Sequence, residues 1–300
     1  MTSTLPTPAA SATPAALGTA PTAAHPRLSI NQATIKYADL ATALRLTADA
    51  GVQSIGLWRE PVAEVGLATA VRLVADSGLR VSSLCRGGFF TSLEGPARRA
   101  AIDENRRAIA ETAALGAPTL VLVAGGLPGG SRDLVGARER VRDAIGELAD
   151  EARAAGVTLA IEALHPMYVS DRAVISTLGQ ALDIAEQFGA DAVGVVVDTF
   201  HVWWDPALTG QIARAGAGGY IASYQVCDWA TPLPAEVLLA RHYPGDGVID
   251  FAAVCALVQA AGYTGDVEVE IFNQAIWDTP AADVVARTVA SFAAAVGPHL

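Results

Sequence analysis

The chain has 300 residues, of which 52% are hydrophobic and 17% are charged, and this is enough material for one globular domain with a large core. The formal net charge of −11 disfavours a nucleic-acid partner, because proteins that bind phosphate backbones carry a basic surface. The three cysteines have no CxxC spacing, so neither a disulfide framework nor a thiolate zinc site is predicted.

The first 26 residues are rich in Ala, Thr and Pro, and we expect a disordered tail over residues 1–26. This segment lacks the charged start and the apolar centre of a signal peptide. The chain also has no run of about 18 apolar residues that would cross a membrane. A cytoplasmic protein without a membrane partner is therefore the expectation.

From residue 27 onward, short β-branched runs alternate with Ala-, Leu- and Arg-rich stretches of helical period, such as 39–51, 104–116 and 139–156. We expect eight strands, which begin near residues 28, 53, 80, 119, 157, 193, 221 and 266. This count and spacing predict an α/β fold, a single (β/α)8 TIM barrel over residues 27–300. A doubly wound open sheet is the competing architecture, but no GxGxxG motif follows the first strand.

Four acidic or amide side chains each stand where a hydrophobic strand ends: Glu162, Asp198, Gln225 and Glu270. Parallel barrel strands all point their C-terminal ends at one face, so we expect these residues to lie side by side at the mouth. Buried carboxylates are costly unless a positive charge lies beside them. Because oxygen donors suit hard divalent cations, we predict a site for Mn²⁺, with Mg²⁺ or Co²⁺ as alternatives. A simpler interpretation, in which each carboxylate caps the following helix, remains open.

Two histidines follow these strand ends. His201 forms an Asp-x-x-His pair with Asp198, and we predict that it orients a ligand or hydrogen-bonds the hydroxyls of a substrate. His165 comes three residues after Glu162 and is a candidate acid or base, although packing against Pro166 would equally explain it.

Further polar and aromatic side chains are expected at the same rim. Arg86 and Lys36 are candidate anchors for substrate oxygen atoms, and Trp58 offers a flat surface on which a sugar can pack. Core packing or solvent exposure would explain each of them as well. Trp203 and Trp204 are expected either to exclude water from the site or to form a subunit contact, so a homo-oligomer or hetero-oligomer remains an open alternative to a monomer.

Three segments carry a family resemblance: IEALHP (161–166), DTFHVWW (198–204) and PGDGVIDFAAVCALVQAAGYTGDVEVEIF (244–272). On these motifs the chain resembles the xylose isomerase-like TIM barrel superfamily, and within it the sugar phosphate isomerase/epimerase branch. The resemblance covers about residues 27 to 295. It implies that the four strand-end residues occupy metal-binding positions and that His201 occupies the position of a substrate-contacting histidine.

Two departures from that branch concern the pocket. Many members carry His where this chain has Gln225, so either an amide oxygen is the fourth ligand, or Gln225 does not bind the metal and water does. The loss of the nitrogen donor favours manganese or magnesium over zinc. Several epimerases carry a further Glu one turn after the metal-binding Glu, where this chain has Met167 and Tyr168. Arg241 and His242, just before the Gly-Asp-Gly turn, are expected to supply polar substrate contacts instead.

The expected function is a divalent-metal-dependent isomerase or epimerase of a keto sugar or polyol. Glu162 and Glu270 would move a proton through a metal-stabilised enediolate while His201 holds a hydroxyl. A metal-dependent lyase or dehydratase shares every step up to the enediolate, and would act on a keto-inositol or an oxidised C-glycoside by β-elimination with His165 as the extra acid or base. The acidic charge and the presence of only five histidines disfavour a metal-dependent endonuclease. A non-catalytic partner subunit is the last alternative.

Overall fold

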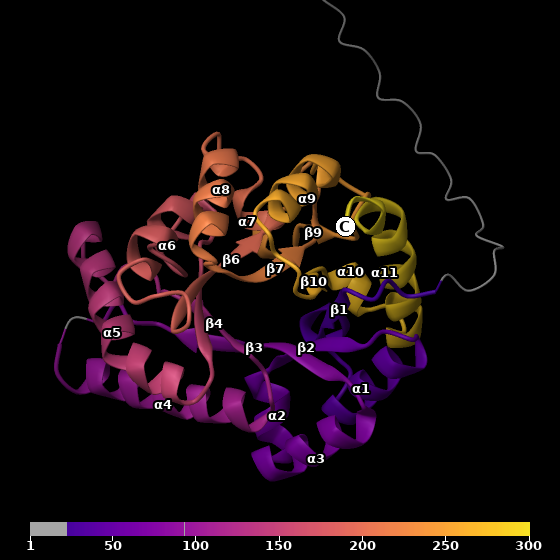
Figure 1. The fold of residues 1–300 in the computed structure, drawn as a ribbon, viewed down its shortest axis with the longest axis horizontal. Helices are drawn as coiled ribbons and strands as arrows, with labels where there is room; N and C mark the ends of the chain where they lie inside the picture. The colour runs from indigo at the N-terminus through magenta and orange to yellow at the C-terminus, as the bar shows by residue number, and fades with distance from the viewer. Residues whose placement is uncertain (1–22, 93) are drawn as a thin grey trace, which may run out of the picture.

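Eight parallel strands close into a barrel in the computed structural model, which describes residues 23–92 and 94–300 (Figure 1). Seven strands follow chain order around the barrel, and the last, β10, lies between β7 and β1. The barrel strands are β1 (Leu28–Asn31), β2 (Ser54–Trp58), β3 (Arg80–Gly88), β4 (Thr119–Val123), β5 (Thr158–Glu162), β6 (Val193–Asp198), β7 (Ile221–Val226) and β10 (Val267–Val269). The predicted (β/α)8 barrel is confirmed, and each strand begins within one residue of its expected position.

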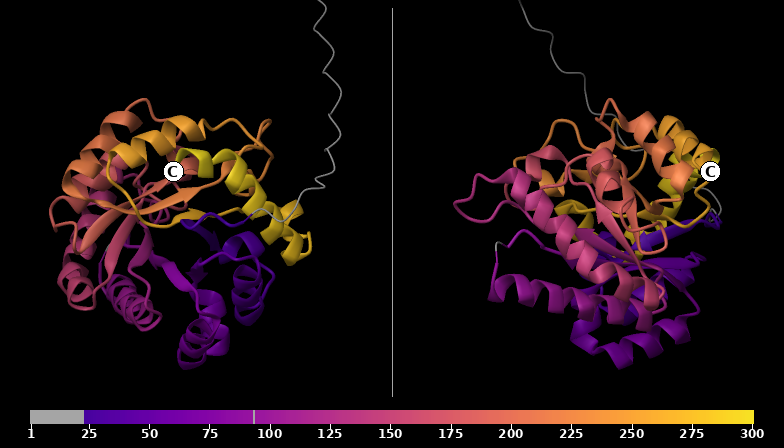
Figure 2. Two further views of the ribbon diagram at one scale, coloured as in Figure 1. Left: turned by 45° about the vertical axis from the view of Figure 1, so that its right-hand side comes forward. Right: turned by 60° about the vertical axis from the view of Figure 1, so that its left-hand side comes forward.

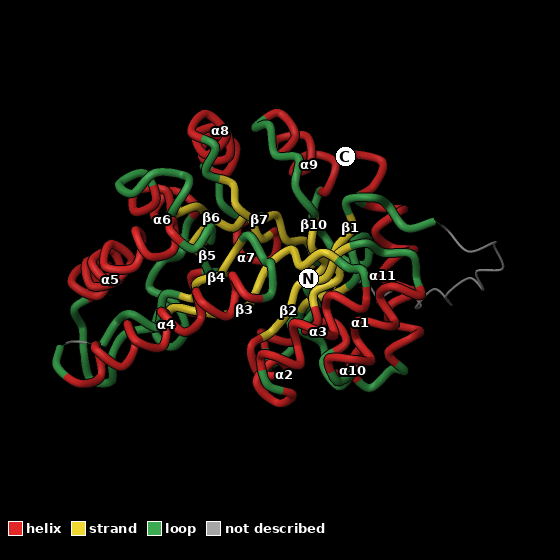
Figure 3. The backbone as a smooth tube through the Cα atoms, turned by 60° about the horizontal axis from the view of Figure 1, so that its bottom comes forward, coloured by secondary structure: helices red, strands yellow, loops and turns green. Residues whose placement is uncertain are grey.

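Helices surround the barrel on its outside, as the turned views show (Figures 2 and 3). They are α1 (Leu40–Asp49), α2 (Arg59–Val65), α3 (Leu67–Ser77), α4 (Pro96–Ala114), α5 (Leu134–Ala154), α6 (Leu178–Ala185), α7 (Thr199–Val202), α8 (Leu208–Gly218), α9 (Phe251–Ala260), α10 (Gln274–Trp277) and α11 (Ala281–Ala295). Helices α4 and α5 start earlier in the chain than the stretches of helical period at 104–116 and 139–156 that predicted them. Pro96 opens α4, and the Asp133 side chain caps α5 by accepting a hydrogen bond from the N–H of Gly136.

The tail expected over residues 1–26 lies mostly outside the described residues. Within the described part, His25 packs against Phe292 of α11 with ring centroids 5.7 Å apart. Across residues 23–92 and 94–300, we find no helix with the length and apolar character needed to cross a bilayer.

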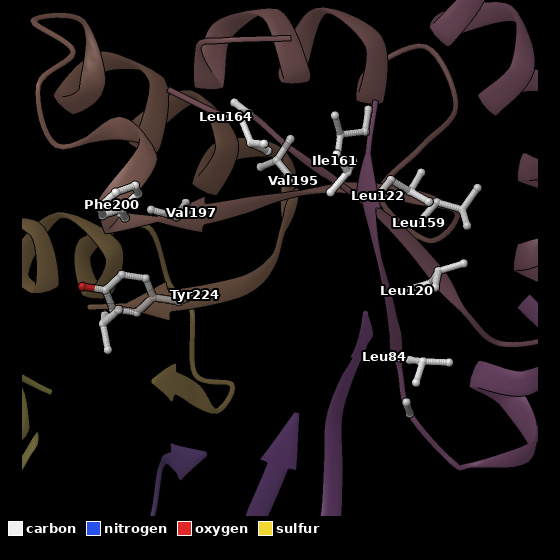
Figure 4. Packing of buried hydrophobic residues seen from close by; sticks show 14 of the residues in the cluster. Leu84, Leu120, Leu122, Leu159, Ile161, Leu164, Val195, Val197, Phe200 and Tyr224 are labelled. Carbon is white, nitrogen blue, oxygen red and sulfur yellow. The ribbon is translucent and has the colours of Figure 1, made fainter. Parts of the chain in front are cut away.

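Alternation along each strand decides which side chains face the helices. Leu159 and Ile161 of β5 belong to the large core between barrel and helices, together with Leu120 and Leu122 of β4. Figure 4 shows these side chains along their strands. The residues between them in the sequence therefore point to the opposite face, into the barrel.

The barrel interior contains a small apolar cluster under the C-terminal mouth. Its members are Cys85, Val121, Ala160 and Val196. Glu162 comes two residues after Ala160, and Asp198 comes two residues after Val196, so the period of two places both carboxylates inside the barrel. The apolar cluster forms the layer below them.

A short antiparallel pair leaves the barrel after β7. It consists of β8 (Asp228–Trp229) and β9 (Arg241–His242). The carboxylate of Asp228 accepts hydrogen bonds from the backbone N–H groups of Gly245 and Gly247 at 2.9 and 2.8 Å. The Gly-Asp-Gly turn is thus tied to the segment that follows Gln225, and this pairing returns Arg241 to the barrel mouth.

Gly88 on β3 is a position that requires glycine, and this gives a test of the barrel. Its φ is 110°, and a Cβ there would overlap the carbonyl group of Val123 on β4. Gly88→Ala is expected to lower the free energy of unfolding by about 3 kcal/mol, measured by urea denaturation.

Gly78→Ala is the matched control. Gly78 follows α3 with φ 70°, and nothing lies within 4 Å of the added Cβ, so only the backbone strain of about 1 kcal/mol remains. Equal losses in the two variants would show that Gly88 is not held against β4 as described.

Candidate active site

A cavity of about 680 Å³ opens at the C-terminal ends of the barrel strands. This volume lies in the range of roughly 300 to 1,000 Å³ that is typical of small-molecule sites. Five of its lining residues are charged or polar and almost fully buried: Gln32, Glu162, His201, Arg241 and Glu270. The last four form its floor. Polar groups that converge at the bottom of a concave site are the usual mark of a binding or catalytic centre.

Four neighbouring strands hold the four predicted metal ligands. Glu162 ends β5, Asp198 ends β6, Gln225 lies on β7 and Glu270 follows β10, and these strands are consecutive in the barrel. Asp198 is in direct register with Gln225. The exposed fraction of each residue is 6% or less. The four residues are therefore buried on adjacent strands, and their role as metal ligands stays a prediction.

Arg241 lies among these carboxylates. Its Nη1 is 3.1 Å from Asp198 Oδ2 and 2.8 Å from Glu270 Oε2. The guanidinium carbon lies 4.7 Å from the ring centroid of Phe200 and 5.0 Å from that of Phe272. The two aromatic rings and two carboxylates hold the guanidinium in the floor of the cavity, where it balances part of the negative charge.

Burial raises the carboxyl pKa values in this floor. Desolvation, followed by the charges of Asp198 and Glu270, raises the pKa of Glu162 well above its usual value. Desolvation also raises the pKa of Asp198, against the lowering influence of Arg241. Desolvation raises the pKa of Glu270 to about 7, also against the lowering influence of Arg241. The site is thus short of positive charge.

The donors fit a divalent cation. Three carboxylates face one guanidinium, so two negative charges remain when all three carboxyls are ionised, and one divalent ion neutralises them. The Oε1 atom of Gln225 is buried and has no hydrogen-bond partner within the described residues. Ligand atoms of Glu162, Asp198 and His201 all lie within 4.8 Å of one another, and this buried cluster could hold a metal ion.

The ring of His201 has polar contacts at both nitrogens. Its Nδ1 accepts the backbone N–H of His165 at 3.1 Å, and its Nε2 lies 3.0 Å from Nη2 of Arg241, which can only donate. Both ring nitrogens of the neutral imidazole are therefore contacted by N–H groups. Burial, followed by the charge of Arg241, lowers the pKa of His201 well below its usual value and favours this neutral form. The Nε2 atom lies 3.8 Å from both Glu162 Oε1 and Asp198 Oδ2. His201 is thus held at the floor of the cavity between Arg241 and the backbone of the loop that follows β5.

Three predicted substrate-binding residues line the cavity wall: Trp58, Arg86 and Lys36. The indole N–H of Trp58 donates to Asn31 Oδ1 at 2.8 Å, which fixes the ring. The guanidinium carbon of Arg86 lies 5.7 Å from the Trp58 ring and 4.8 Å from the Phe89 ring. Aromatic and cationic groups thus meet on one wall of the cavity.

Four predicted site residues are not among the described residues that line the cavity: the metal-ligand candidates Asp198 and Gln225, and the two histidines His165 and His242. The His165 ring packs against Trp204 and Trp229, with centroids 5.4 and 5.3 Å apart. Its contribution to the floor is the backbone N–H that binds His201. His242 pairs with Asp228 on the β8–β9 ladder.

Sequence reasoning missed Glu268. This side chain is 1% exposed and accepts hydrogen bonds from groups on β1, β3 and β7. The signal was present in DVEVEIF, because residues 268 and 270 share the inward face of a strand with a period of two.

A family model described as the xylose isomerase-like TIM barrel matches residues 44–294, and the chain belongs to this family. Among solved structures, the protein SMc04130 from Sinorhizobium meliloti is 48% identical, with a TM-score of 0.88 over 90% of this chain and 98% of that one. The IolI protein with a bound zinc atom is 22% identical, with a TM-score of 0.79 over 91% of this chain and 99% of that one, and this likeness concerns the fold.

Curated relatives are enzymes that the chain matches over shorter stretches. The L-ribulose 3-epimerase of Mesorhizobium japonicum is 31% identical over 45% of this chain and 41% of that protein. The inosose isomerase of Halalkalibacterium halodurans is 28% identical over 46% of this chain and 48% of that protein. The 3-dehydroshikimate dehydratase of Pseudomonas putida is 33% identical over 35% of this chain and 17% of that protein. The chain thus spans less than half the length of these relatives.

Glu270 gives a prediction for the metal-free protein. Its pKa is about 7 in the folded state against an ordinary value of 4.5, so between these values the folded state binds more protons than the unfolded chain. This carboxyl therefore favours folding at low pH and costs stability as the pH rises through about 7. Between about pH 5 and about pH 8, the chelated wild-type protein should lose roughly 3 kcal/mol relative to Glu270→Gln, measured by urea unfolding. Parallel pH profiles for the two proteins would contradict this.

Proposed function

We propose that this protein is a divalent-metal-dependent isomerase or epimerase that acts on a keto sugar or polyol. One observation carries the proposal. Glu162 and Glu270 come from the two outer strands of a run of four, and both reach the cavity, while Asp198 and Gln225 lie between them. Two carboxyl groups on either side of one cation site suit a reaction that removes a proton at one position and returns it at another.

Mn²⁺ is the proposed ion, with Mg²⁺ or Co²⁺ as alternatives, because the donors are three carboxylates and one amide oxygen. Glu162, Asp198, Gln225 and Glu270 would hold it. When bound, a divalent cation supplies positive charge that stabilises an enediolate. The zinc atom of the IolI structure is a property of that protein, and Gln225 is our reason for preferring a harder ion here.

Glu162 and Glu270 act as the proton-transferring pair in this proposal. One accepts the proton from the carbon next to the carbonyl group, and the other returns a proton to the neighbouring carbon or to the opposite face. A pKa of about 7 for Glu270 would let this carboxyl both accept and release a proton near neutral pH. The burial of both groups keeps bulk water from competing for the proton.

The remaining residues bind and orient the substrate. His201 contacts a substrate oxygen at the floor of the cavity, and Arg241 lowers the pKa values of Asp198 and Glu270 against the raising effect of their burial. Arg86 and Lys36 anchor the distal oxygens, and Trp58 packs against the apolar face of the sugar. These roles are supported by the position of each side chain on the floor or wall of the cavity.

A lyase or dehydratase is the second candidate. It is favoured by the similarity to the 3-dehydroshikimate dehydratases of Pseudomonas putida and Pseudomonas aeruginosa, at 33% and 29% identity. Such an enzyme would form the same enediolate and then expel a β-substituent from a keto-inositol or an oxidised C-glycoside. In this alternative His201 is better placed than His165 to contact the leaving group, because His201 lines the cavity.

Proton exchange tests the leading proposal. The Mn²⁺-loaded protein is incubated with ketoses and keto-inositols in deuterated water, and deuterium incorporation is followed by NMR. Glu162→Gln and Glu270→Gln are each expected to lower the exchange rate by about 100-fold or more, because each lacks one partner of the acid/base pair. Glu186→Gln is the control, since Glu186 is paired with Arg214 on the surface. Undiminished exchange in Glu270→Gln would exclude the assigned role.

Product mass separates the two candidate functions. The same panel, extended to oxidised C-glycosides, is analysed by mass spectrometry. An isomerase or epimerase gives products of unchanged mass, which is the result we expect. Products that lack water or have released an aglycone would instead establish elimination as the reaction.

A further inference from the structure

We infer that Glu268 fixes the orientation of the Gln225 amide so that Gln225 presents its Oε1 atom as an oxygen ligand to a divalent cation. Glu268 is then a positioning residue that sets the affinity of the metal site through Gln225. This inference rests on the proposed metal dependence, and it assigns a role to a buried acid that the proposed reaction does not use.

The carboxylate of Glu268 lies one layer below the floor of the cavity and is surrounded by neutral donors. It accepts hydrogen bonds from Asn31 Nδ2 at 2.6 Å, Ser82 Oγ at 2.5 Å, Ser83 Oγ at 2.9 Å and Gln225 Nε2 at 3.2 Å. Donors from three strands, β1, β3 and β7, therefore converge on one acceptor group. A buried acid with this many dedicated donors is fixed in position.

The direction of these hydrogen bonds is determined by the surroundings of Asn31. Its Oδ1 accepts the backbone N–H of Ala33 at 2.9 Å and the indole N–H of Trp58 at 2.8 Å. Neither donor can act as an acceptor, so the NH₂ group of Asn31 must face Glu268. Glu268 Oε1 is consequently an acceptor, and the same oxygen receives the amide of Gln225.

The Gln225 amide is thereby oriented. Its NH₂ group faces Glu268, its register partner on β10, and its other register partner is Asp198 on β6. The Oε1 atom is buried and has no hydrogen-bond partner within residues 23–92 and 94–300. An unpartnered buried acceptor beside a cluster of carboxylates is the arrangement that a cation satisfies.

Space for Glu268 depends on Gly56. A Cβ at Gly56 on β2 would lie 2.5 Å from the carboxyl carbon of Glu268 and 2.6 Å from each of its oxygens. Because real atoms do not approach so closely, any larger residue at 56 would displace the carboxylate. The chain thus combines a glycine, two serines and an asparagine around this one acid.

A double-mutant cycle on the full chain tests the inference. The chelated protein is titrated with Mn²⁺, and the free ion is measured by electron paramagnetic resonance, so that no enzyme activity is needed. Glu268→Met and Gln225→Met are each expected to weaken Mn²⁺ binding by about 10- to 100-fold. Because Glu268 acts through Gln225, the double variant should bind no more weakly than the weaker of the two single variants.

Glu268→Gln is the conservative variant. It keeps an oxygen that can accept from Gln225, so the Mn²⁺ affinity should stay within about three-fold of the wild-type value. Asp266→Asn is the control. Asp266 directly precedes β10, and its carboxylate accepts hydrogen bonds from the side chains of Ser54 and Arg80. Its Mn²⁺ affinity should be unchanged. If Glu268→Met fails to fold, Gly56→Ala takes its place in the cycle.

The outcomes separate the inference from the proposed function. Losses that multiply in the double variant, or a Glu268→Met protein that binds Mn²⁺ as the wild type does, would overturn the inference and leave the proposed function standing. Failure of the wild-type protein to bind Mn²⁺ would overturn both. Coupled losses without any proton exchange on sugars would support the inference and contradict the proposed reaction.

Discussion

The burial of three carboxylates around a single guanidinium is the constraint on which the rest of the site depends. Glu162, Asp198 and Glu270 are nearly inaccessible to solvent, and within the described chain Arg241 forms ion pairs with Asp198 and Glu270. Burial without full charge balance raises carboxyl pKa values and makes the empty site costly at neutral pH. A divalent cation relieves this cost, so stability and function depend on the same charge balance.

The barrel produces this cluster through two simple rules. Alternation along each strand turns every second residue inward, and parallel pairing places the last inward residue of each strand at one face. Among the described α-helices, only α7 carries a residue of the floor: it begins directly after Asp198 and holds His201 one turn later. Arg241 does not follow these two rules, because it is not on a barrel strand. It lies on β9, and the pairing of β9 with β8 places it at the barrel mouth.

These rules explain what could be predicted from the sequence. Glu162, Asp198, Gln225 and Glu270 were identifiable because each ends a β-branched run, and the barrel topology then gathers them. The place of Arg241 in the floor was not, since it depends on a ladder of two short strands that has no periodic pattern. The role of Glu268 depends on donors from distant strands, and the position of the His201 ring depends on a backbone N–H from another loop. Neither contact has a local sequence signal.

The central claim is that one cation binds to oxygens from four consecutive strands. The most direct measurement is an anomalous difference map from crystals of the full chain grown with Mn²⁺. We expect a single peak at coordination distance from Glu162, Asp198, Glu270 and the Oε1 atom of Gln225. A map without a peak in the barrel mouth, or a peak coordinated by other residues while Arg241 alone balances the carboxylates, would contradict the claim.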